Sequence, residues 1–346
     1  MLLSLGDAMR HRNAIFANTK RLVKKLRYLF EIRLIEFMAW SLPWSQRWFI
    51  MALARWIGLL AYLCDRRGRS TSLENLRCAF GDLYTMAERK RIARGSYQNF
   101  ARTFFDLFWS SRLKADNWQK YISVRLHSSQ AEQEAREKGG IWVTPHAGNF
   151  EFFSLTWGYR GLPFTVLAQN FKNPGLTPIF RRLRSHSGQS VISQETAILK
   201  LMKLLKRGGY VGMLADLNIE PGRTAAAIQC FGLWTSVPTL HIQLAQRLGL
   251  SIIPSICMPL PRGRYEVTTL ANINPKPGDD IREMTQTVWD HCEKAIRQQP
   301  ECWLWMYKHW RFRPTGTTLV HDPAYPTYAN YCQSLVDMIP EGLRPK

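Results

Sequence analysis

Acidic residues are scarce in this 346-residue chain, which has 26 Asp and Glu against 47 Lys and Arg and a formal charge of +21. Such a basic balance favours a polyanionic partner: nucleic acid, an anionic membrane or an acidic carrier. The sequence has no helix-turn-helix, zinc-finger or RNA-binding signature to support nucleic acid. The thirteen tryptophans and seventeen phenylalanines favour a membrane instead, because amphipathic rings settle at bilayer interfaces.

Paired cysteine motifs are also missing. The seven cysteines are odd in number, scattered, and contain no C-x-x-C. This pattern predicts reduced thiols in a cytosolic compartment rather than a disulfide scaffold or a zinc site. No serine lies in a G-x-S-x-G context, so a serine nucleophile of that type is not indicated. The hydrophobic content of 46% still allows a sizeable core, and the length suits one large α/β domain or two smaller ones.

The N-terminal region lacks both a signal-peptide cleavage pattern and a clean apolar run of the roughly 20 residues that span a bilayer. Residues 10–33 carry eight Lys or Arg against one acid. The apolar, Trp-rich segment that follows is interrupted by Pro43, Arg47 and Arg55, and Trp48–Cys64 offers only 17 residues. We therefore predict an interfacial or re-entrant helix pair on an anionic leaflet. A helical hairpin buried inside the domain stays open, because length and periodicity do not separate the two.

Strand and helix patterns alternate from residue 139 onward, which predicts an α/β fold with a mostly parallel, mixed sheet flanked by helices. The strand-like runs are Ile141–Val143, Phe164–Ala168, Val191–Ser193, Tyr210–Leu214, Ser251–Ile256 and Tyr265–Leu270. One helix is expected over Thr239–Leu248. Another is expected in TAILKLMKLLKRGG, with an apolar stripe of Ile198, Leu201, Met202 and Leu205.

Three regions are expected along the chain. Residues 1–85 form a basic, membrane-associated helical region, 86–315 the α/β domain, and 316–346 an extension that wraps the surface or is loose. A helix over 86–113 places four aromatic rings on one face, which pack the core or line an acyl groove. The rings are those of Tyr97, Phe100, Phe104 and Phe108.

The stretch GGIWVTPHAGNFEFF at 139–153 holds the main candidate for chemistry. His146 follows a buried strand that ends at Thr144, and open α/β sheets bind ligands at the carboxyl ends of their strands. A strand–turn–helix corner folds Glu151 back against the imidazole, where a carboxylate fixes the tautomer and leaves a base. The bare H-x4-E spacing is weak, because His127 and Glu132 match it too. On this pattern alone, both a catalytic and a structural role of His146 remain possible interpretations.

TPHAGNFE resembles the H-x4-D/E motif of the lysophospholipid acyltransferase superfamily, in the branch of the bacterial lipid A late acyltransferases (lauroyl/myristoyl acyltransferase type). Other blocks resemble that family in order along residues 30–315. They are ENLRCAFGD at 74–82, NPGLTPIFRRLRSHSGQSVI at 173–192, LLKRGGYVGMLAD at 204–216, CFGLWTSVPTLHIQLAQRLGLSIIP at 230–254 and PECWLWMYKHWRF at 300–312.

The resemblance implies roles for individual residues. His146 would be the general base, Glu151 its orienter, and Asp216 a third catalytic residue. Substrate-binding roles would fall to Asn149, Arg181, Arg184, His309 and Arg311, with Gly188 following the arginine of the second block. The chain departs from the family in three places. Leu217 and Asn218 follow Asp216 where Gln or His is usual, Trp310 replaces an arginine, and TSVPTL replaces T-P-A-G-P.

The resemblance further implies an O-acyltransferase at the cytoplasmic face of a bacterial inner membrane. Its donor would be acyl carrier protein, preferred over coenzyme A (acyl-CoA), and its acceptor a hydroxyl of a lipid A precursor or similar anionic glycolipid. No metal is expected, because His146 has no neighbouring His or Cys at ligand spacing. A cofactor and nucleic acid are not expected either. Two alternatives remain: acylation of another lipid, such as a mannoside or an aminolipid, and a non-catalytic basic protein that binds membrane or nucleic acid.

Overall fold

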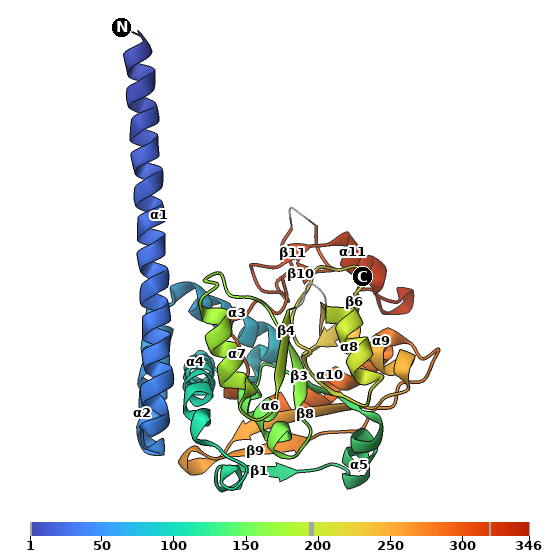
Figure 1. Cartoon of the computed structure of the whole chain (residues 1–346). Coiled ribbons are helices and arrows are strands. Elements are labelled where there is room, and N and C mark those ends of the chain that lie inside the picture. The colour runs from blue at the N-terminus through green and yellow to red at the C-terminus, as the bar shows by residue number, and fades with distance from the viewer. Residues whose placement is uncertain (1, 194–196, 318–319, 346) are drawn as a thin grey trace.

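The computed structural model describes residues 2–193, 197–317 and 320–345, with the side chains of residues 2–15, 17 and 18 excluded. Arg10 and Arg12, two of the predicted basic side chains, therefore lie outside the described part, as does Thr196. Figure 1 shows the element order. The helices are α1 (Leu2–Ser41), α2 (Arg47–Cys64), α3 (Arg66–Phe80), α4 (Met86–Trp109), α5 (Ser129–Lys138), α6 (Phe150–Tyr159), α7 (Leu176–Ser185), α8 (Ala197–Leu205), α9 (Leu240–Leu248), α10 (Ile281–Gln298) and α11 (Gln333–Met338).

A seven-stranded sheet forms the centre of the domain, in the order β1-β9-β8-β2-β5-β3-β4. Its strands are β1 (Ile122–Arg125), β2 (Gly140–Thr144), β3 (Phe164–Ala168), β4 (Ser190–Ser193), β5 (Tyr210–Leu214), β8 (Ile252–Pro259) and β9 (Tyr265–Thr269). Neighbours run parallel except β8 and β9, which are antiparallel. The predicted mixed, mostly parallel sheet is confirmed.

Helices cover both faces of this sheet, and β2 shows why. Successive side chains of a strand point to opposite faces. Trp142 accordingly packs in the core beneath α4, α6 and α7. Ile141 and Val143 pack in a second core beneath α8, α9 and α10. All three side chains are fully buried, so β2 is the middle of the domain and its carboxyl end is held firmly.

The four-aromatic helix predicted over 86–113 is α4. Thr85 begins it with a reciprocal capping box, in which its hydroxyl accepts from the Glu88 amide and the Glu88 carboxylate accepts from Thr85. Of the predicted ring stripe, Tyr97 and Phe108 are buried, whereas Phe100 is 43% exposed. The rings serve mainly to pack α4 onto the domain.

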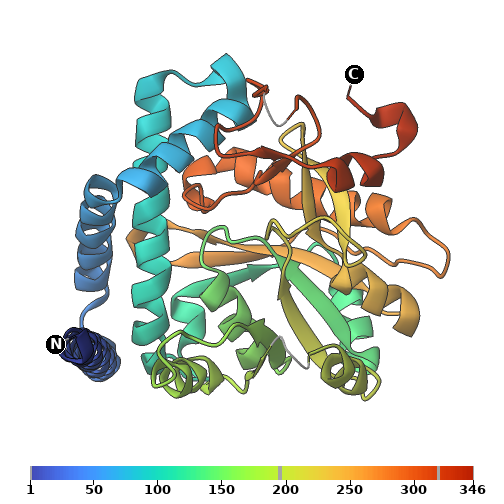
Figure 2. The same ribbon diagram turned by 90° about the horizontal axis from the view of Figure 1, so that it is seen from above.

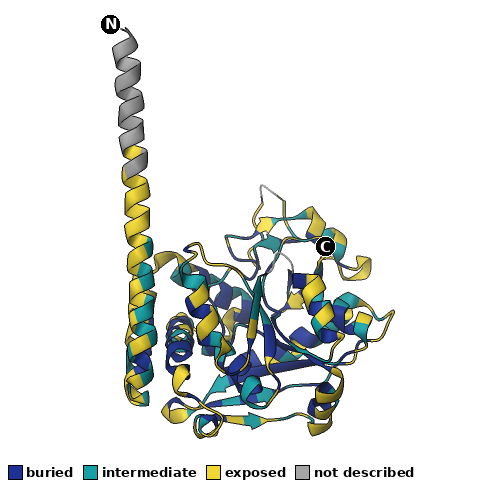
Figure 3. Cartoon of the chain, viewed as in Figure 1, coloured by how far each residue is buried: buried dark blue, intermediate teal, exposed yellow. Residues whose placement is uncertain are grey.

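The two N-terminal helices lie along one side of the domain. Figure 1 shows α1 rising beyond the body as a long rod, and Figure 2, seen from above, shows α2 beside α4 with α1 at the outer edge. Figure 3 shows that most of the described part of α1 is exposed. Only its last turns pack on the domain, where Asn173 donates to the Tyr28 carbonyl (3.0 Å) and the Glu31 carboxylate (2.9 Å).

Several elements differ from the sequence prediction. The four-residue strand β1 and the antiparallel hairpin of β6 (Ala225–Cys230) and β7 (Leu233–Pro238) were not predicted. The alanine-rich run of β6 carries little strand signal. The predicted apolar stripe of α8 is wrong at Ile198, which is 52% exposed, whereas Ala197 is buried in its place.

The C-terminal extension wraps the domain surface, which was one of its two predicted states. Its strand β11 (Asn330–Tyr331) pairs with β10 (Phe312–Arg313), and α11 follows. Leu335 and Ile339 bury their side chains in a small cluster with Trp234 of the β6–β7 hairpin. All seven cysteines of the chain are free thiols, as the scattered pattern predicted.

Candidate active site

Strand register brings His146 and Asp216 together. Thr144 at the end of β2 is paired with Leu214 at the end of the neighbouring parallel strand β5. His146 and Asp216 each lie two residues past that pair. Because the carboxyl ends of parallel strands meet at one sheet edge, the two side chains emerge beside each other, at the place where open α/β sheets bind their ligands.

The Asp216 carboxylate accepts two hydrogen bonds from His146. Nδ1 of the imidazole lies 2.8 Å from Oδ1, and the backbone N–H donates to Oδ2 at 2.8 Å. A carboxylate only accepts, so Nδ1 carries the proton, and the lone pair of the neutral ring is on Nε2. Nε2 makes no hydrogen bond to any residue that the structure describes, and the side chain is 17% exposed. The ring can therefore act as a base through Nε2.

Electrostatics support this pairing. Burial disfavours a charged imidazole, but the charge and hydrogen bond of Asp216, with a contribution from Glu151, outweigh it and raise the pKa of His146 above its ordinary value. Burial also opposes ionisation of Asp216. The charge and hydrogen bonds of His146, together with the N–H of Trp303, nevertheless lower the pKa of Asp216 to about 2. The carboxylate is therefore ionised at neutral pH.

Two aromatic residues of the C-terminal signature complete the surroundings of Asp216. Trp303 donates its indole N–H to Oδ2 at 2.8 Å. The predicted substrate-binding residue His309 stacks on Trp303 with ring centroids 3.7 Å apart, and its Nε2 lies 2.9 Å from the Leu304 carbonyl. Burial lowers the pKa of His309 to about 4, so this ring is neutral. It is 3% exposed and packs behind Asp216 rather than in the open part of the site.

Glu151, expected to orient His146, is paired with Arg184 instead. The Arg184 guanidinium donates to both carboxylate oxygens of Glu151, through Nη2 at 2.5 Å and Nε at 3.0 Å. Asp216 fills the position expected of Glu151, because strand register delivers it directly to Nδ1, whereas Glu151 on the first turn of α6 is held by Arg184. Glu151 still adds to the raised pKa of His146 through its charge.

The turn between β2 and α6 is held by backbone contacts on two sides. The N–H of Gly148 donates to the Cys302 carbonyl at 2.9 Å, and that of Asn149 to the Cys257 carbonyl at 2.7 Å. Gly148 has φ +61°, and a Cβ there would lie 2.0 Å from the Cys257 oxygen. Only glycine fits this position.

The three remaining predicted site residues are Asn149, Arg311 and Arg181. Asn149 is wholly buried, where its carbonyl caps α6 by accepting from the Phe152 amide at 2.9 Å. Arg311 donates to Asn218 at 3.0 Å. Asn218, the second residue after Asp216, is buried and also donates to the Ser236 carbonyl of β7. Arg181 lies exposed on α7.

In the second H-x4-E pair, the glutamate has a structural role. His127 is exposed, whereas Glu132 is buried and receives hydrogen bonds from Arg136 and Arg160, each at 2.6 Å. These two arginines fasten α5 to the end of α6. The two histidines are therefore distinguished by the buried strand that precedes His146, not by their spacing to a glutamate.

Comparisons with known proteins identify the class. Residues 18–312 match the family described as bacterial lipid A biosynthesis acyltransferase. The chain is 22% identical over 265 residues to the lipid A biosynthesis lauroyltransferase of Escherichia coli, covering 75% of this chain and 84% of that protein. It is 20% identical over 275 residues to the lipid A biosynthesis acyltransferase of Haemophilus influenzae, covering 77% and 82%.

Two further likenesses are more partial. The phosphatidylinositol mannoside acyltransferase of Mycobacterium tuberculosis is 23% identical over 177 residues, covering 50% of this chain and 54% of that protein. The crystal structure of the 1-acyl-sn-glycerophosphate acyltransferase of Thermotoga maritima aligns with 14% identity and a TM-score of 0.35, covering 75% and 99%.

The protein is therefore an acyltransferase that acts on lipid. It belongs to the bacterial lipid A biosynthesis acyltransferase family, whose match extends from within α1 to β10.

Proposed function

We propose that the enzyme transfers a fatty acyl chain from an acyl thioester to a hydroxyl of a lipid A precursor or a similar anionic glycolipid. The observation that carries this proposal is the His146–Asp216 pair at the carboxyl end of β2, with the second imidazole nitrogen free of protein partners among the described residues. The family match and the names of the two lipid A relatives support the acceptor.

In the proposed reaction, Nε2 of His146 removes the proton of the acceptor hydroxyl as its oxygen attacks the thioester carbonyl carbon. The C–O bond forms, the tetrahedral oxyanion collapses, and the C–S bond breaks. The departing thiolate takes the proton from the imidazolium, which returns His146 to its neutral form. Asp216 stabilises the imidazolium in between and keeps the ring in its reactive tautomer.

Arg184 is the proposed contact for a negative group. Its side chain extends from α7 to Glu151, which lies on the first turn of α6. The Arg184 side chain remains 20% exposed. Exposed Arg181 and Arg182 extend the positive charge along α7. A cluster of guanidinium groups suits a phosphorylated head group, so we place the acceptor head group, rather than the transient oxyanion, at this helix.

The proposed donor is acyl carrier protein, with coenzyme A as the alternative thioester. The net charge of +21 supports an acidic protein donor, because long-range attraction speeds the encounter of oppositely charged partners. Saturation kinetics with each donor at two salt concentrations test this choice. A carrier-protein reaction is expected to slow more strongly at high salt.

The proposed site of action is the cytoplasmic face of the inner membrane. Among the described residues, α2 is the one helix that is long and apolar enough, by length and composition, to cross a bilayer. Large apolar side chains stand exposed on both N-terminal helices and their connection, including Trp40, Trp44, Trp48 and Trp56 at 65–81% exposure. Exposed lysines and arginines flank them on α1. This combination supports an interfacial position on an anionic leaflet.

A second acceptor is favoured by one observation. The phosphatidylinositol mannoside acyltransferase relative matches over half of this chain, which keeps a mannoside lipid as a candidate. Mass spectrometry of total lipids from cells with and without the protein tests both. The proposal predicts that a lipid A species heavier by one acyl group disappears when the protein is absent. Loss of an acylated mannoside with unchanged lipid A would contradict it.

A further inference from the structure

The helix α4 presents a second stripe of side chains that the sequence pattern did not reveal. Asn99, Thr103 and Asp106 are spaced by four and three residues and therefore share one face. Thr103 is 2% exposed and Asp106 is wholly buried. Buried polar groups need partners, and all three find theirs in the turn that follows His146.

Each side chain of this polar face contacts that turn. Asn99 donates to the Gly148 carbonyl at 3.1 Å, and the Thr103 hydroxyl donates to the same oxygen at 3.0 Å. The Asp106 carboxylate accepts from the side-chain amide of Asn149 at 2.8 Å. Asn149 in turn caps the helix that carries Glu151.

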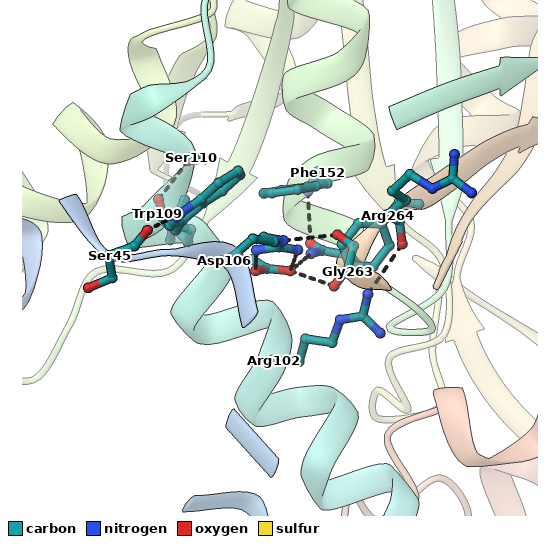
Figure 4. Close-up of polar contacts among 12 residues, drawn as sticks. Ser45, Arg102, Asp106, Trp109, Ser110, Phe152, Gly263 and Arg264 are labelled. Atoms are coloured by element: carbon teal, nitrogen blue, oxygen red, sulfur yellow. Dashed lines mark hydrogen bonds and ion pairs between the residues drawn. The ribbon is translucent and has the colours of Figure 1, made fainter. Parts of the chain in front are cut away.

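The other partners of Asp106 come from elements far apart in sequence. Figure 4 shows its carboxylate within a group of polar contacts, close to Trp109 and Phe152. The hydroxyl of Tyr265 on β9 donates to Oδ2. Arg47, the first residue of α2, donates to both carboxylate oxygens and, through Nε, to the Gly263 carbonyl at 2.9 Å. The Arg47 guanidinium also lies 4.5 Å from the ring centre of Trp109.

We propose that Asn99, Thr103 and Asp106 are positioning residues that set the place of the His146 turn, and that Arg47 fastens this turn to α2. The reasoning is geometric. The His146 imidazole meets Asp216 only if its backbone stays in place, and the turn belongs to no helix or extended strand, so its position depends on individual hydrogen bonds to the residues around it. The α4 face supplies side-chain contacts to Gly148 and Asn149, two of the three residues that connect His146 with α6. The link to α2 rests on the proposed role of that helix at the membrane.

This role predicts a readout beyond activity. The groups that face His146 are Asp216, Glu151 with its partner Arg184, and neutral His309. If the turn shifts, the contact of His146 with Asp216 lengthens and the pKa of His146 falls toward its ordinary value. Carbethoxylation of His146 by diethyl pyrocarbonate, followed by mass spectrometry across pH, reports that titration without any substrate.

A matched pair of buried threonines provides the test. Thr103 and Thr285 are both 2% exposed and both lie on helices, but Thr285 donates within α10, to the Ile281 carbonyl. Each Thr→Val change keeps the shape and removes one hydroxyl. We expect Thr103→Val to lower kcat about tenfold with KM changed less than about twofold, since small misplacements are costly in catalysis. Thr103→Ser should restore most of the rate, and Thr285→Val should stay within about twofold of wild type.

Asp106→Asn is expected to lower kcat further, because it removes the charge that holds Arg47. Should that variant fail to fold, the threonine pair decides alone. The expected result is a midpoint of His146 modification that moves to lower pH in Thr103→Val and not in Thr285→Val. Equal kcat and equal midpoints in the two valine variants would overturn the positioning role. Absence of acyl transfer by the wild type with either donor would overturn the proposed function instead, and the modification midpoints would still decide the positioning role.

Discussion

His146 and Asp216 are 70 residues apart in the chain, and the pairing of Thr144 with Leu214 brings their side chains within 2.8 Å. The contact depends on strand order. Because β5 lies directly beside β2 in parallel orientation, equal steps past the paired residues end at the same place. The imidazole is thereby held on one nitrogen and left open on the other.

Asp216→Asn should impair catalysis through His146. The amide cannot stabilise the imidazolium and no longer selects the tautomer, so kcat should fall by about 10²–10⁴-fold. Asp216 raises the pKa of His146, so the acid limb of the remaining pH–rate profile should move to lower pH. Steady-state kinetics between pH 5 and pH 9 measure both effects. An unchanged acid limb would mean that the titrating base is not His146.

Asp216 should also make the folded protein sensitive to acid. Its pKa is lowered from 3.8 to about 2, so its contribution is complete above the unfolded value and disappears as pH falls through the folded one. The shift corresponds to about 2 kcal/mol of unfolding free energy. His146 is protonated throughout this window and its raised pKa acts only at higher pH. Urea unfolding of wild type and Asp216→Asn from pH 5 to pH 2 should show this difference, and parallel curves would contradict it.

A substitution of Arg184 should show whether the Glu151–Arg184 ion pair serves acceptor binding, measured by KM, or the chemical step, measured by kcat. Lysine keeps the charge of Arg184 but cannot donate to both Glu151 oxygens, as Arg184 does in the structure. If the α7 arginines hold the acceptor head group, Arg184→Lys should raise the acceptor KM several-fold and leave kcat largely intact. A lower kcat with unchanged KM would assign Arg184 to the oxyanion. Arg247→Lys, at an exposed arginine on α9 outside the proposed site, is the matched control.

Membrane binding should depend on charge and on exposed tryptophan. Each basic residue near an anionic surface adds about 1 kcal/mol, so retention on anionic vesicles should weaken as salt rises. Replacement of Trp44 and Trp48 by serine should weaken it further, whereas the same change at exposed Leu343, far from α1 and α2 in the chain, should not. Vesicle flotation at low and high salt measures this. Salt-independent retention that requires detergent for release would indicate a spanning helix.

The sheet was largely predictable because its strands are strong signals. Runs such as Phe164–Ala168 and Tyr210–Leu214 were predicted with the bounds that the structure has. The order of the strands was not, since no local pattern states that β5 lies beside β2. The contact between His146 and Asp216 could therefore not be derived from spacing, although the family resemblance pointed to both residues.

The expected role of Glu151 shows the limit of a short motif. The H-x4-E pattern places an acid near the histidine but does not say which way it points. In the structure the Glu151 carboxylate contacts Arg184 on α7, a helix that lies outside the motif. The polar face of α4 was missed for a related reason. Its aromatic stripe dominates the sequence pattern, whereas Asn99, Thr103 and Asp106 acquire meaning only beside the His146 turn.

The most direct test of the account is the rate of acyl transfer by His146→Ala, with His127→Ala as the control at the second H-x4-E pair. His146 carries the proposed base, so its loss should lower the rate by about 10²–10⁴-fold while circular dichroism and vesicle binding stay unchanged. His127 is exposed and should be replaceable with less than about twofold effect. A rate for His146→Ala within about threefold of wild type would contradict general-base catalysis at this histidine.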